Sequence, residues 1–399
     1  MVTGLGIASP IGLGVADFWA AACRGYSGIG PVTRFDAGPY PAKLAGEVRE
    51  FTADKHLPAR LLPQTDRMTQ LALVAADWAF GDAGVRPPDL PEFSIGVVTA
   101  SSCGGFEFGQ RELQNLWSKG SEYVSAYQSF AWFYAVNTGQ ISIRHGLRGP
   151  GSVLVSDQAG GLDAIAQARR HIRKGQRLTL AGGMDAPICS WSWVAQLASR
   201  RLSSRDDPAS AYVPFAADAC GHVPGEGGAL LVVEPATAAR RRAARRIYGE
   251  IAGYGATFDP KPGSGREPGL RTALERALDD AGLSPEQISV VFADAAAVPE
   301  LDRVEAAALS KVFGPRGVPV TAPKTMTGRL YSGGAPLDVA VALLAMREGL
   351  IPPTVGVSVS PEYEIDLVTE ARSAPLTAAL VVARGYGGFN SALILRACE

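Results

Sequence analysis

The stretch with the clearest potential for chemistry is 152–175, where a short strand is followed by an elbow and a helix. Residues 153–155 are an apolar, mostly β-branched run typical of a buried strand. From residue 162 apolar side chains recur at three- and four-residue spacing, and cations and a glycine end the run, as in a helix. The elbow, 157–161, would hold a side chain at a helix N-terminus, where unpaired N–H groups favour negative charge. An enzyme would place a nucleophile and an oxyanion hole there.

The elbow carries Gln158, which has no nucleophilic atom to offer. A carboxamide cannot be deprotonated near neutral pH, so the position is shaped for attack and lacks the attacking group. Cys103 could be interpreted as a relocated nucleophile, but no motif places a histidine beside it, and a free cysteine is more often a small buried hydrophobe. We interpret His145 and His222 as structural.

The elements that must position this elbow alternate between strands and helices along the chain. The patterns predict strands at 1–10, 93–100, 153–155, 176–184, 228–234, 247–254, 290–292, 318–321, 378–383 and 392–395, and helices at 17–23, 60–81, 104–117, 162–175, 270–281, 302–312 and 337–346. Such alternation predicts βαβ units around mostly parallel, buried sheets. The rhythm breaks near 236–246, which predicts two similar halves, 1–236 and 247–399. We expect an α/β fold with duplicated βαβ halves in five layers, αβαβα.

Composition excludes several functional classes. Lys and Arg number 38 and Asp and Glu 39, a net charge of −1, which indicates neither a nucleic-acid nor a membrane-surface partner. The basic cluster at 240–246 is interpreted as a solvated helix face, with docking of an acidic carrier protein as the alternative. The five cysteines have no paired spacing, which argues for the reducing cytoplasm and against disulfides or a metal site. We expect neither a signal peptide nor a membrane span.

Five segments in order resemble the motifs of ketosynthases of the thiolase-like superfamily: the elbow, 223–229, 293–305, 324–329 and 385–390. Active members carry a cysteine at the elbow and two histidines, one in Thr-His-Gly-Thr-Gly-Thr-Pro and one in Lys-Ser-x-x-Gly-His. Aligned on these motifs, Gln158 stands at the cysteine, Asp294 at the first histidine and Arg329 at the second. Glu305 and Lys324 are retained motif residues. The resemblance therefore implies a site without its catalytic residues.

Because all three catalytic positions are replaced together, the chain resembles the chain-length factor, the ketosynthase-β subunit of type II polyketide synthases. The resemblance implies that the chain pairs with a cysteine-bearing ketosynthase-α subunit, which condenses malonyl units on an acyl carrier protein. It also implies that the poly-β-keto chain grows in a tunnel at the heterodimer interface. No cofactor is implied beyond the phosphopantetheine arm of the carrier protein.

Opposite charges at two of the replaced positions predict an ion pair between Asp294 and Arg329. We expect Lys324 and Glu305 to join it, because two carboxylates and two cations sum to zero charge and make a buried cluster tolerable.

Phe106, Gly109 and Leu113 lie at i, i+3 and i+7 and share one helix face. Spacing alone is equally consistent with a core stripe, whereas the resemblance implies a tunnel wall. A glycine inside a helix costs about 1 kcal/mol relative to alanine, and room for a growing chain would compensate. Because Gly109 and Leu113 are small, the tunnel would be blocked only far along its length, and the product would be long. The residues expected to close it are Phe106, Trp191, Ser192 and Trp193, and Phe133 and Tyr134 are expected either in the core or across the dimer interface.

Two other functions compete with this interpretation. Ketosynthase-like domains with glutamine at the elbow can decarboxylate malonyl-carrier protein to make the starter unit, but those domains keep both histidines. Asp294 would place negative charge where an enolate oxygen develops, which disfavours decarboxylation. The remaining alternative is a scaffold homodimer. Purification of the chain alone as a stable dimer would support it.

Overall fold

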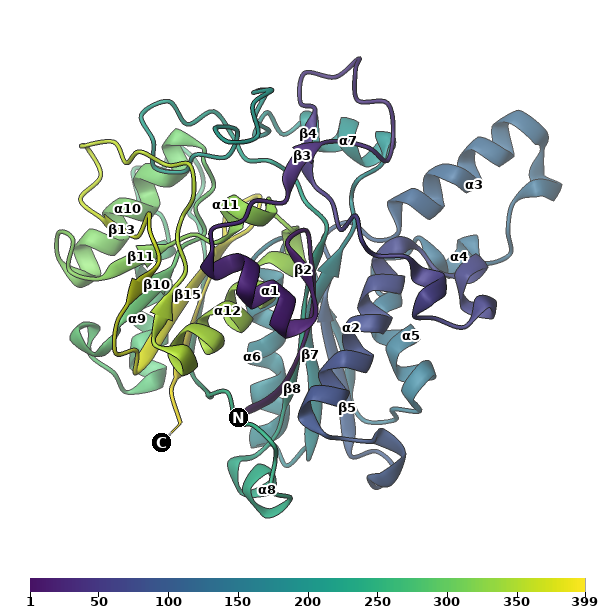
Figure 1. Ribbon diagram of the computed structural model, residues 1–399, viewed down its shortest axis with the longest axis horizontal. Helices are drawn as coiled ribbons and strands as arrows, with labels where there is room; N and C mark the ends of the chain where they lie inside the picture. The colour runs from purple at the N-terminus through teal and green to yellow at the C-terminus, as the bar shows by residue number, and fades with distance from the viewer. Residues whose placement is uncertain (399) are drawn as a thin grey trace.

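The computed structural model describes residues 1–398 and contains two large sheets, each built from one half of the chain (Figure 1). The first has the order β2-β1-β8-β7-β5-β6, formed by β1 (Val2–Ser9), β2 (Gly12–Leu13), β5 (Ile95–Ala100), β6 (Gly151–Leu154), β7 (Leu178–Asp185) and β8 (Gly227–Val233). The second has the order β13-β11-β10-β15-β16-β9, formed by β9 (Glu250–Phe258), β10 (Val290–Phe292), β11 (Pro319–Thr321), β13 (Asp366–Leu367), β15 (Ala378–Arg384) and β16 (Phe389–Arg396). Two short pairs complete the described strands, β3 (Ile29–Pro31) with β4 (Leu44–Gly46) and β12 (Leu350–Ile351) with β14 (Arg372–Ser373).

Helices form three layers around these sheets. Between the sheets lie α6 (Gly160–Arg173) and α12 (Gly334–Glu348), and one hydrophobic cluster joins their side chains to both sheets. Helix α12 is buried on every side from Gly334 to Met346, which explains its uniformly apolar sequence. The outer layers are α2 (Arg67–Ala83) with α5 (Val136–His145) on the first sheet, and α9 (Leu270–Ala281) with α10 (Pro299–Phe313) on the second. The predicted αβαβα arrangement is confirmed.

The expectation of mostly parallel sheets was wrong in part, because both sheets are mixed. β5, β6 and β7 run parallel to one another, as do β10, β11, β13 and β15. The β7–β8, β1–β8, β15–β16 and β16–β9 pairs are antiparallel. Between β15 and β16 only residues 385–388 intervene, too few for the crossover that a parallel connection requires.

Several element boundaries differ from the sequence patterns. The long helix expected within 60–81 is α2, which begins at Arg67, because the Asp66 carboxylate accepts the Met68 N–H at 2.8 Å and caps the helix. Helices α5 and α7 (Ser190–Leu197) were not predicted. The remaining described α-helices are α1 (Gly14–Cys23), α3 (Phe106–Lys119), α4 (Gln128–Ala131), α8 (Ala236–Arg241) and α11 (Lys324–Thr327).

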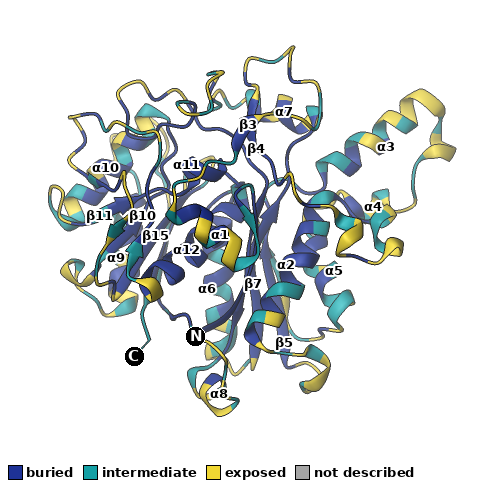
Figure 2. Ribbon diagram, in the orientation of Figure 1, coloured by how far each residue is buried: buried dark blue, intermediate teal, exposed yellow. Residues whose placement is uncertain are grey.

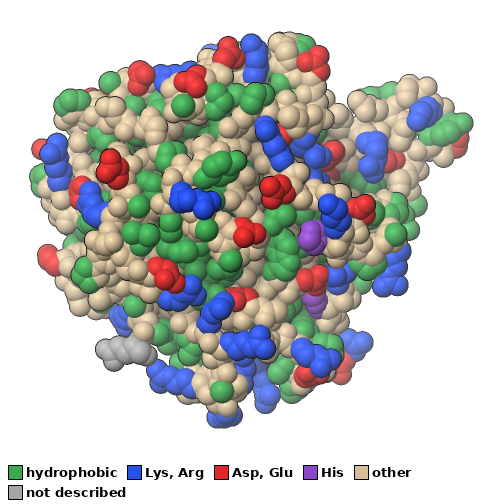
Figure 3. All heavy atoms as spheres, in the orientation of Figure 1, with side chains coloured by type: hydrophobic (Ala, Val, Ile, Leu, Met, Phe, Trp, Pro, Cys, Tyr) green, Lys and Arg blue, Asp and Glu red, His purple; other side chains and the backbone are tan. Residues whose placement is uncertain are grey.

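Two surface regions stand out from the body of the molecule. Helices α3 and α4 project from it, and the outer part of α3 is exposed (Figures 1 and 2). Acidic and basic side chains are interspersed on the face shown in Figure 3, and Lys and Arg gather near α8, where Arg240 and Arg241 are exposed as predicted. Across residues 1–398, none of the helices combines the length and apolarity needed to cross a membrane.

Candidate functional site

The elbow between β6 and α6 places Gln158 in the centre of the molecule, with 0% of its surface exposed. Asp157, just before it, adopts a left-handed backbone (φ 52°), and its carboxylate accepts the Tyr386 N–H at 2.8 Å. On α6, a Cβ added at Gly161 would lie 2.2 Å from the Pro336 Cδ of α12. A glycine is therefore required where the two central helices meet.

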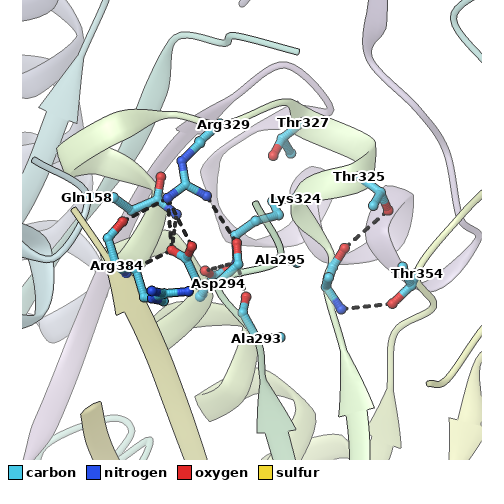
Figure 4. A network of polar contacts seen from close by, with 12 residues as sticks. Gln158, Ala293, Asp294, Ala295, Lys324, Thr325, Thr327, Arg329, Thr354 and Arg384 are labelled. Carbon is cyan, nitrogen blue, oxygen red and sulfur yellow. Dashed lines mark hydrogen bonds and ion pairs between the residues drawn. The ribbon is translucent and has the colours of Figure 1, made fainter. Parts of the chain in front are cut away.

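Gln158, Asp294 and Arg329 meet in one buried network (Figure 4). The Gln158 Nε2 donates to the Asp294 Oδ1 at 3.2 Å. The Arg329 Nη2 donates to both carboxylate oxygens of Asp294, at 2.9 and 3.1 Å. The predicted ion pair is confirmed, although the three residues come from the elbow, the end of β10 and the segment after α11.

Arg384, at the end of β15, completes the network through its backbone. Its N–H donates to the Asp294 Oδ1 at 2.8 Å, and its carbonyl accepts the Arg329 Nη2 at 2.8 Å. Burial disfavours the charged form of Arg329, but the Asp294 carboxylate outweighs that effect and raises the pKa of the guanidinium above its usual value. The Asp294 carboxylate is therefore held by donors from three separate segments of the chain.

The prediction that Lys324 joins this pair was wrong. Its ammonium pairs with the Asp338 carboxylate on α12 at 2.8 Å and donates to the Ala293 carbonyl. Charge is thus balanced in two separate buried pairs rather than in one group of four.

Glu305 supports the network through the backbone only. On α10, it accepts the N–H groups of Asp294 at 2.7 Å and Ala295 at 2.8 Å. Burial and the neighbouring Asp294 raise its pKa to about 7. Ala295 and Ala297 in the same loop have left-handed backbones, with φ of 49° and 54°, a conformation that non-glycine residues adopt at some energetic expense. Glu305 therefore fixes a strained loop at the place where Asp294 is presented.

A pocket of about 900 Å³ lies beside the network. Its walls come from the loops 259–266 and 385–389 and from α7, and Arg329 reaches its surface whereas Gln158 does not. A ligand in the pocket would thus meet Arg329 and Asp157 of the elbow, but not Gln158.

His222 also lines this pocket, which the sequence patterns did not indicate. It is 6% exposed, and its Nδ1 has no hydrogen-bond partner within residues 1–398. Burial, with Arg329 and Arg201 nearby, lowers its pKa well below the usual range, so the imidazole is neutral. The position of His222 directly before the glycine-rich segment 223–229 is the sequence feature that could have indicated its place in the site.

Cys103 does not replace the missing nucleophile. Burial, followed by the charge of Asp185, raises the pKa of its thiol well above the ordinary value. A protonated thiol is a poor nucleophile. The site thus combines an amide, an ion pair and one neutral histidine, which cannot form a thioester.

The residues expected along the tunnel fall into two groups. Phe106 packs edge-on against Trp191, with ring centroids 4.8 Å apart. A Cβ added at Gly109 would lie 3.1 Å from the Trp191 Cζ3 and 3.4 Å from the Trp132 Cβ. Trp191 is 39% exposed, and Leu113 is half-buried one turn further along α3. The structure therefore brings Phe106, Gly109 and Trp191 together on one surface.

Ser192 and Trp193 do not share that surface. Trp193 is fully buried, donates its indole N–H to the Ala42 carbonyl at 3.0 Å and packs edge-on against Phe35. Ser192 is buried and accepts a hydrogen bond from the Gln196 side chain at 3.0 Å. Residues 191 and 193 lie on the same helix, where positions two apart point in different directions.

An apolar surface surrounds the outer edge of the first sheet. Phe133 and Tyr134 are 40% and 45% exposed, so they are not core residues in the single chain. Ile143 and Val155 are 77% and 52% exposed. Strand β6 (Gly151–Leu154) pairs with β5 and forms the edge of its sheet. The expectation of a buried strand at 153–155 was therefore wrong: residues 152–154 are only half-buried because none of the described strands covers this edge, and Val155 lies just beyond the strand.

Family models match most of the chain, the "Beta-ketoacyl synthase, N-terminal domain" over residues 1–239 and the "Beta-ketoacyl synthase, C-terminal domain" over residues 248–358. The chain belongs to the β-ketoacyl synthase family. Within this family, it is 58% identical over 398 residues to the "Actinorhodin polyketide putative beta-ketoacyl synthase 2" of Streptomyces coelicolor, covering 99% of this chain and 98% of the relative. It is 59% identical over 399 residues to the "Tetracenomycin polyketide synthase ketoacyl synthase beta subunit" of Streptomyces glaucescens, with the same coverage.

Solved structures of β-ketoacyl synthases share the fold. "The ishigamide ketosynthase/chain length factor" superposes with a TM-score of 0.89 at 28% identity, covering 100% of this chain and 98% of the other. An acyl-carrier protein–ketosynthase complex of a type II polyketide synthase, "bound to the hexaketide", has a TM-score of 0.88 at 26% identity, with coverage of 100% and 98%. With the two relatives above, these likenesses place the chain among the ketosynthase-β subunits, the chain-length factors.

The buried Asp66 carboxyl should make the stability of this β-ketoacyl synthase family member depend on pH. Its two carboxylate oxygens accept the N–H groups of Met68 and Phe108, each at 2.8 Å, and so tie α3 to α2. Burial raises its pKa from 3.8 to about 7. Because the pKa is higher in the folded state, protonated Asp66 contributes fully to the free energy of unfolding below pH 3.8. This contribution, at most about 4 kcal/mol, is lost as the pH rises to about 7.

Chemical denaturation of the wild type and of Asp66→Asn across this pH window tests the assignment. The free energy of unfolding of the wild type should fall relative to that of the variant as the pH rises, since the amide side chain of the variant does not titrate. Parallel pH profiles of the two proteins would show that Asp66 ionises normally.

Proposed function

We propose that this chain is a non-catalytic, chain-length-determining subunit of a type II polyketide synthase. It pairs with a cysteine-bearing ketosynthase-α subunit, and the pair condenses malonyl units carried on the phosphopantetheine arm of an acyl carrier protein. We further propose a cytoplasmic location, in keeping with its five free cysteines. The observation that carries the proposal is the buried network of Gln158, Asp294 and Arg329.

The network explains why the condensation chemistry must come from another chain. Decarboxylative Claisen condensation requires a nucleophile that forms a thioester and neutral donors that stabilise the developing enolate. We assign Gln158 to the nucleophile position and Asp294 and Arg329 to the two histidine positions of the family motifs. None of the three can form the thioester, and the Asp294 charge opposes an enolate.

The exposed edge of the first sheet supports a ketosynthase-α partner. Strand β6 offers unpaired backbone groups, and Ile143, Val155, Phe133 and Tyr134 surround it with exposed apolar side chains. An uncovered, apolar edge strand is an association site. We therefore propose that ketosynthase-α covers this edge and that Phe133 and Tyr134 contact it.

We propose that the projecting helix α3 forms one wall of the tunnel for the poly-β-keto chain. Phe106, Gly109 and Leu113 supply its face, and Trp191 packs across it. Ser192 and Trp193 then act indirectly by fixing α7. The small side chains at 109 and 113 favour a long product.

A reconstituted complex with ketosynthase-α and malonyl-carrier protein tests the division of labour. Gln158→Ala should keep product formation within about threefold of the wild type, because the amide takes part in no bond change. The matched change in the partner, its elbow cysteine to alanine, should lower product formation by at least about a thousandfold. Loss of condensation in Gln158→Ala, with the complex intact, would contradict the proposal.

Incubation of the isolated chain with malonyl-carrier protein tests the decarboxylase alternative. We expect no acetyl-carrier protein, because the Asp294 carboxylate lies 3.2 Å from the Gln158 amide, where enolate charge would form. Acetyl product from the chain alone would favour starter-unit formation, and a stable self-pair that resists ketosynthase-α would favour a scaffold homodimer.

A further inference from the structure

Gln110 joins the two helices that carry the proposed tunnel wall. It lies on α3, one residue after Gly109, and its Oε1 accepts the Trp191 backbone N–H at 2.7 Å and the Ser190 hydroxyl at 3.0 Å. The acceptor in both hydrogen bonds is the same side-chain oxygen, and both donors belong to the first turn of α7. The contact bridges 80 residues of sequence and is not implied by any motif in the chain.

Helix α7 has no side-chain oxygen at its own N-cap. The N-cap is Cys189, which makes no capping hydrogen bond with its side chain. The first N–H groups of a helix have no partner within the helix, and Ser, Thr, Asp or Asn at the N-cap usually supplies one. Gln110 supplies it from a neighbouring helix, so the start of α7 is fixed relative to α3.

The geometry ties this cap to the position of one side chain. Trp193, two residues further along α7, is anchored in the core by its hydrogen bond to the Ala42 carbonyl. With the helix held at Trp193 and at the Trp191 N–H, the Trp191 ring lies against Phe106 and over Gly109. The ring is 39% exposed, so it is not enclosed on every side.

We propose that Gln110 is a positioning residue for product length, and this rests on the proposed function. By capping α7 from α3 it holds Trp191 across the surface of Gly109, and this sets how far the growing chain can extend. Gln110 touches neither the chain nor the reacting atoms; it acts through Trp191. Removing the acceptor oxygen lets the ring leave, and the share of longer products rises.

Two substitutions separate the acceptor from the bulk of the side chain. Gln110→Met keeps the length and shape but has no oxygen, whereas Gln110→Glu keeps an acceptor that the positive end of α7 favours. Gln114→Met is the matched control, because Gln114 lies one turn along α3 from Gln110 and its side chain makes no hydrogen bond within the described residues. Trp191→Ala removes the ring and tests directly whether the proposed tunnel wall limits product length.

Each variant is reconstituted with ketosynthase-α, and the ratio of longer to shorter products is measured. Gln110→Met should raise that ratio by about fivefold, the scale of one lost helix cap. Gln110→Glu and Gln114→Met should leave it within about twofold of the wild type. Trp191→Ala should raise it at least as far as Gln110→Met.

The outcomes distinguish failure of this inference from failure of the proposed function. If Trp191→Ala changes the ratio and Gln110→Met does not, Gln110 has no positioning role. If neither changes it while the complex still makes polyketide, the tunnel wall is assigned wrongly. If Gln110→Glu shifts the ratio as Gln110→Met does, the acceptor oxygen is not what matters, and the inference is overturned.

A second readout does not depend on product formation. The fluorescence difference between each protein and its Trp191→Phe counterpart isolates the emission of Trp191. Acrylamide should quench this emission more strongly in Gln110→Met than in the wild type, and Gln110→Glu should restore the wild-type value. Equal quenching in all three proteins would contradict the inference even if Gln110→Met were too unstable to assemble.

Discussion

Asp294→Ala should lower the free energy of unfolding by about 3–5 kcal/mol, the usual effect of breaking a buried ion pair from one side. The carboxylate accepts hydrogen bonds from the Gln158 amide, the Arg329 guanidinium and the Arg384 N–H. Its removal leaves a guanidinium that is 6% exposed without a counter-ion. Leaving a buried charge unpaired costs more than the pair itself contributed.

Urea denaturation of the isolated chain measures this effect. Glu267→Ala serves as the control, because it removes one carboxylate from the exposed ion pairs of Arg271, and we expect a far smaller change there. Replacing both partners, as Asp294→Leu with Arg329→Met, should recover part of the lost stability. An Asp294→Ala variant as stable as the Glu267→Ala control would show that the pair is hydrated rather than buried.

Ile143→Asp should weaken the proposed complex with ketosynthase-α by at least about a hundredfold in Kd. Ile143 lies on α5 and is 77% exposed in the single chain, so the substitution should leave the fold of the chain intact. In the complex, the new carboxylate would be buried against an apolar surface with no counter-ion, which costs several kcal/mol. Val155→Asp, just after β6, should act in the same direction.

Sedimentation of the mixed subunits gives the affinity. Tyr26→Asp is the matched control: it is 58% exposed and follows α1, which packs on β1, at the far end of the first sheet from β6. We expect this control to bind ketosynthase-α as the wild type does. If both Ile143→Asp and Val155→Asp bind ketosynthase-α with wild-type affinity, the β6 edge is not the interface.

Features that depend on local order along the chain could be predicted from the sequence. The strand–elbow–helix around Gln158, the two halves and the five layers follow from apolar periodicity and turn residues, which each segment carries in itself. The pairing of Asp294 with Arg329 was also predictable, because the family motifs bring both positions to one site and opposite charges buried together must pair.

Other features depend on distances between segments that no periodicity records. Lys324 pairs with Asp338 rather than with Asp294, because α12 brings the Asp338 carboxylate to 2.8 Å from its ammonium. Trp191 and Trp193 have the same residue type and neighbouring positions, yet one reaches the surface and the other fills the core. His222 lies in the pocket wall without any sequence motif of its own.

The sequence by itself thus determined the kind of site, since the missing nucleophile and the two charged replacements are matters of residue type. Only the tertiary structure decided which partner each buried polar group finds, because a hydrogen bond requires contact within about 3 Å and chain spacing does not set that distance. Gln110 and Trp191 are the clearest case: neither residue signals the other, and the packing of α3 beside α7 makes them partners.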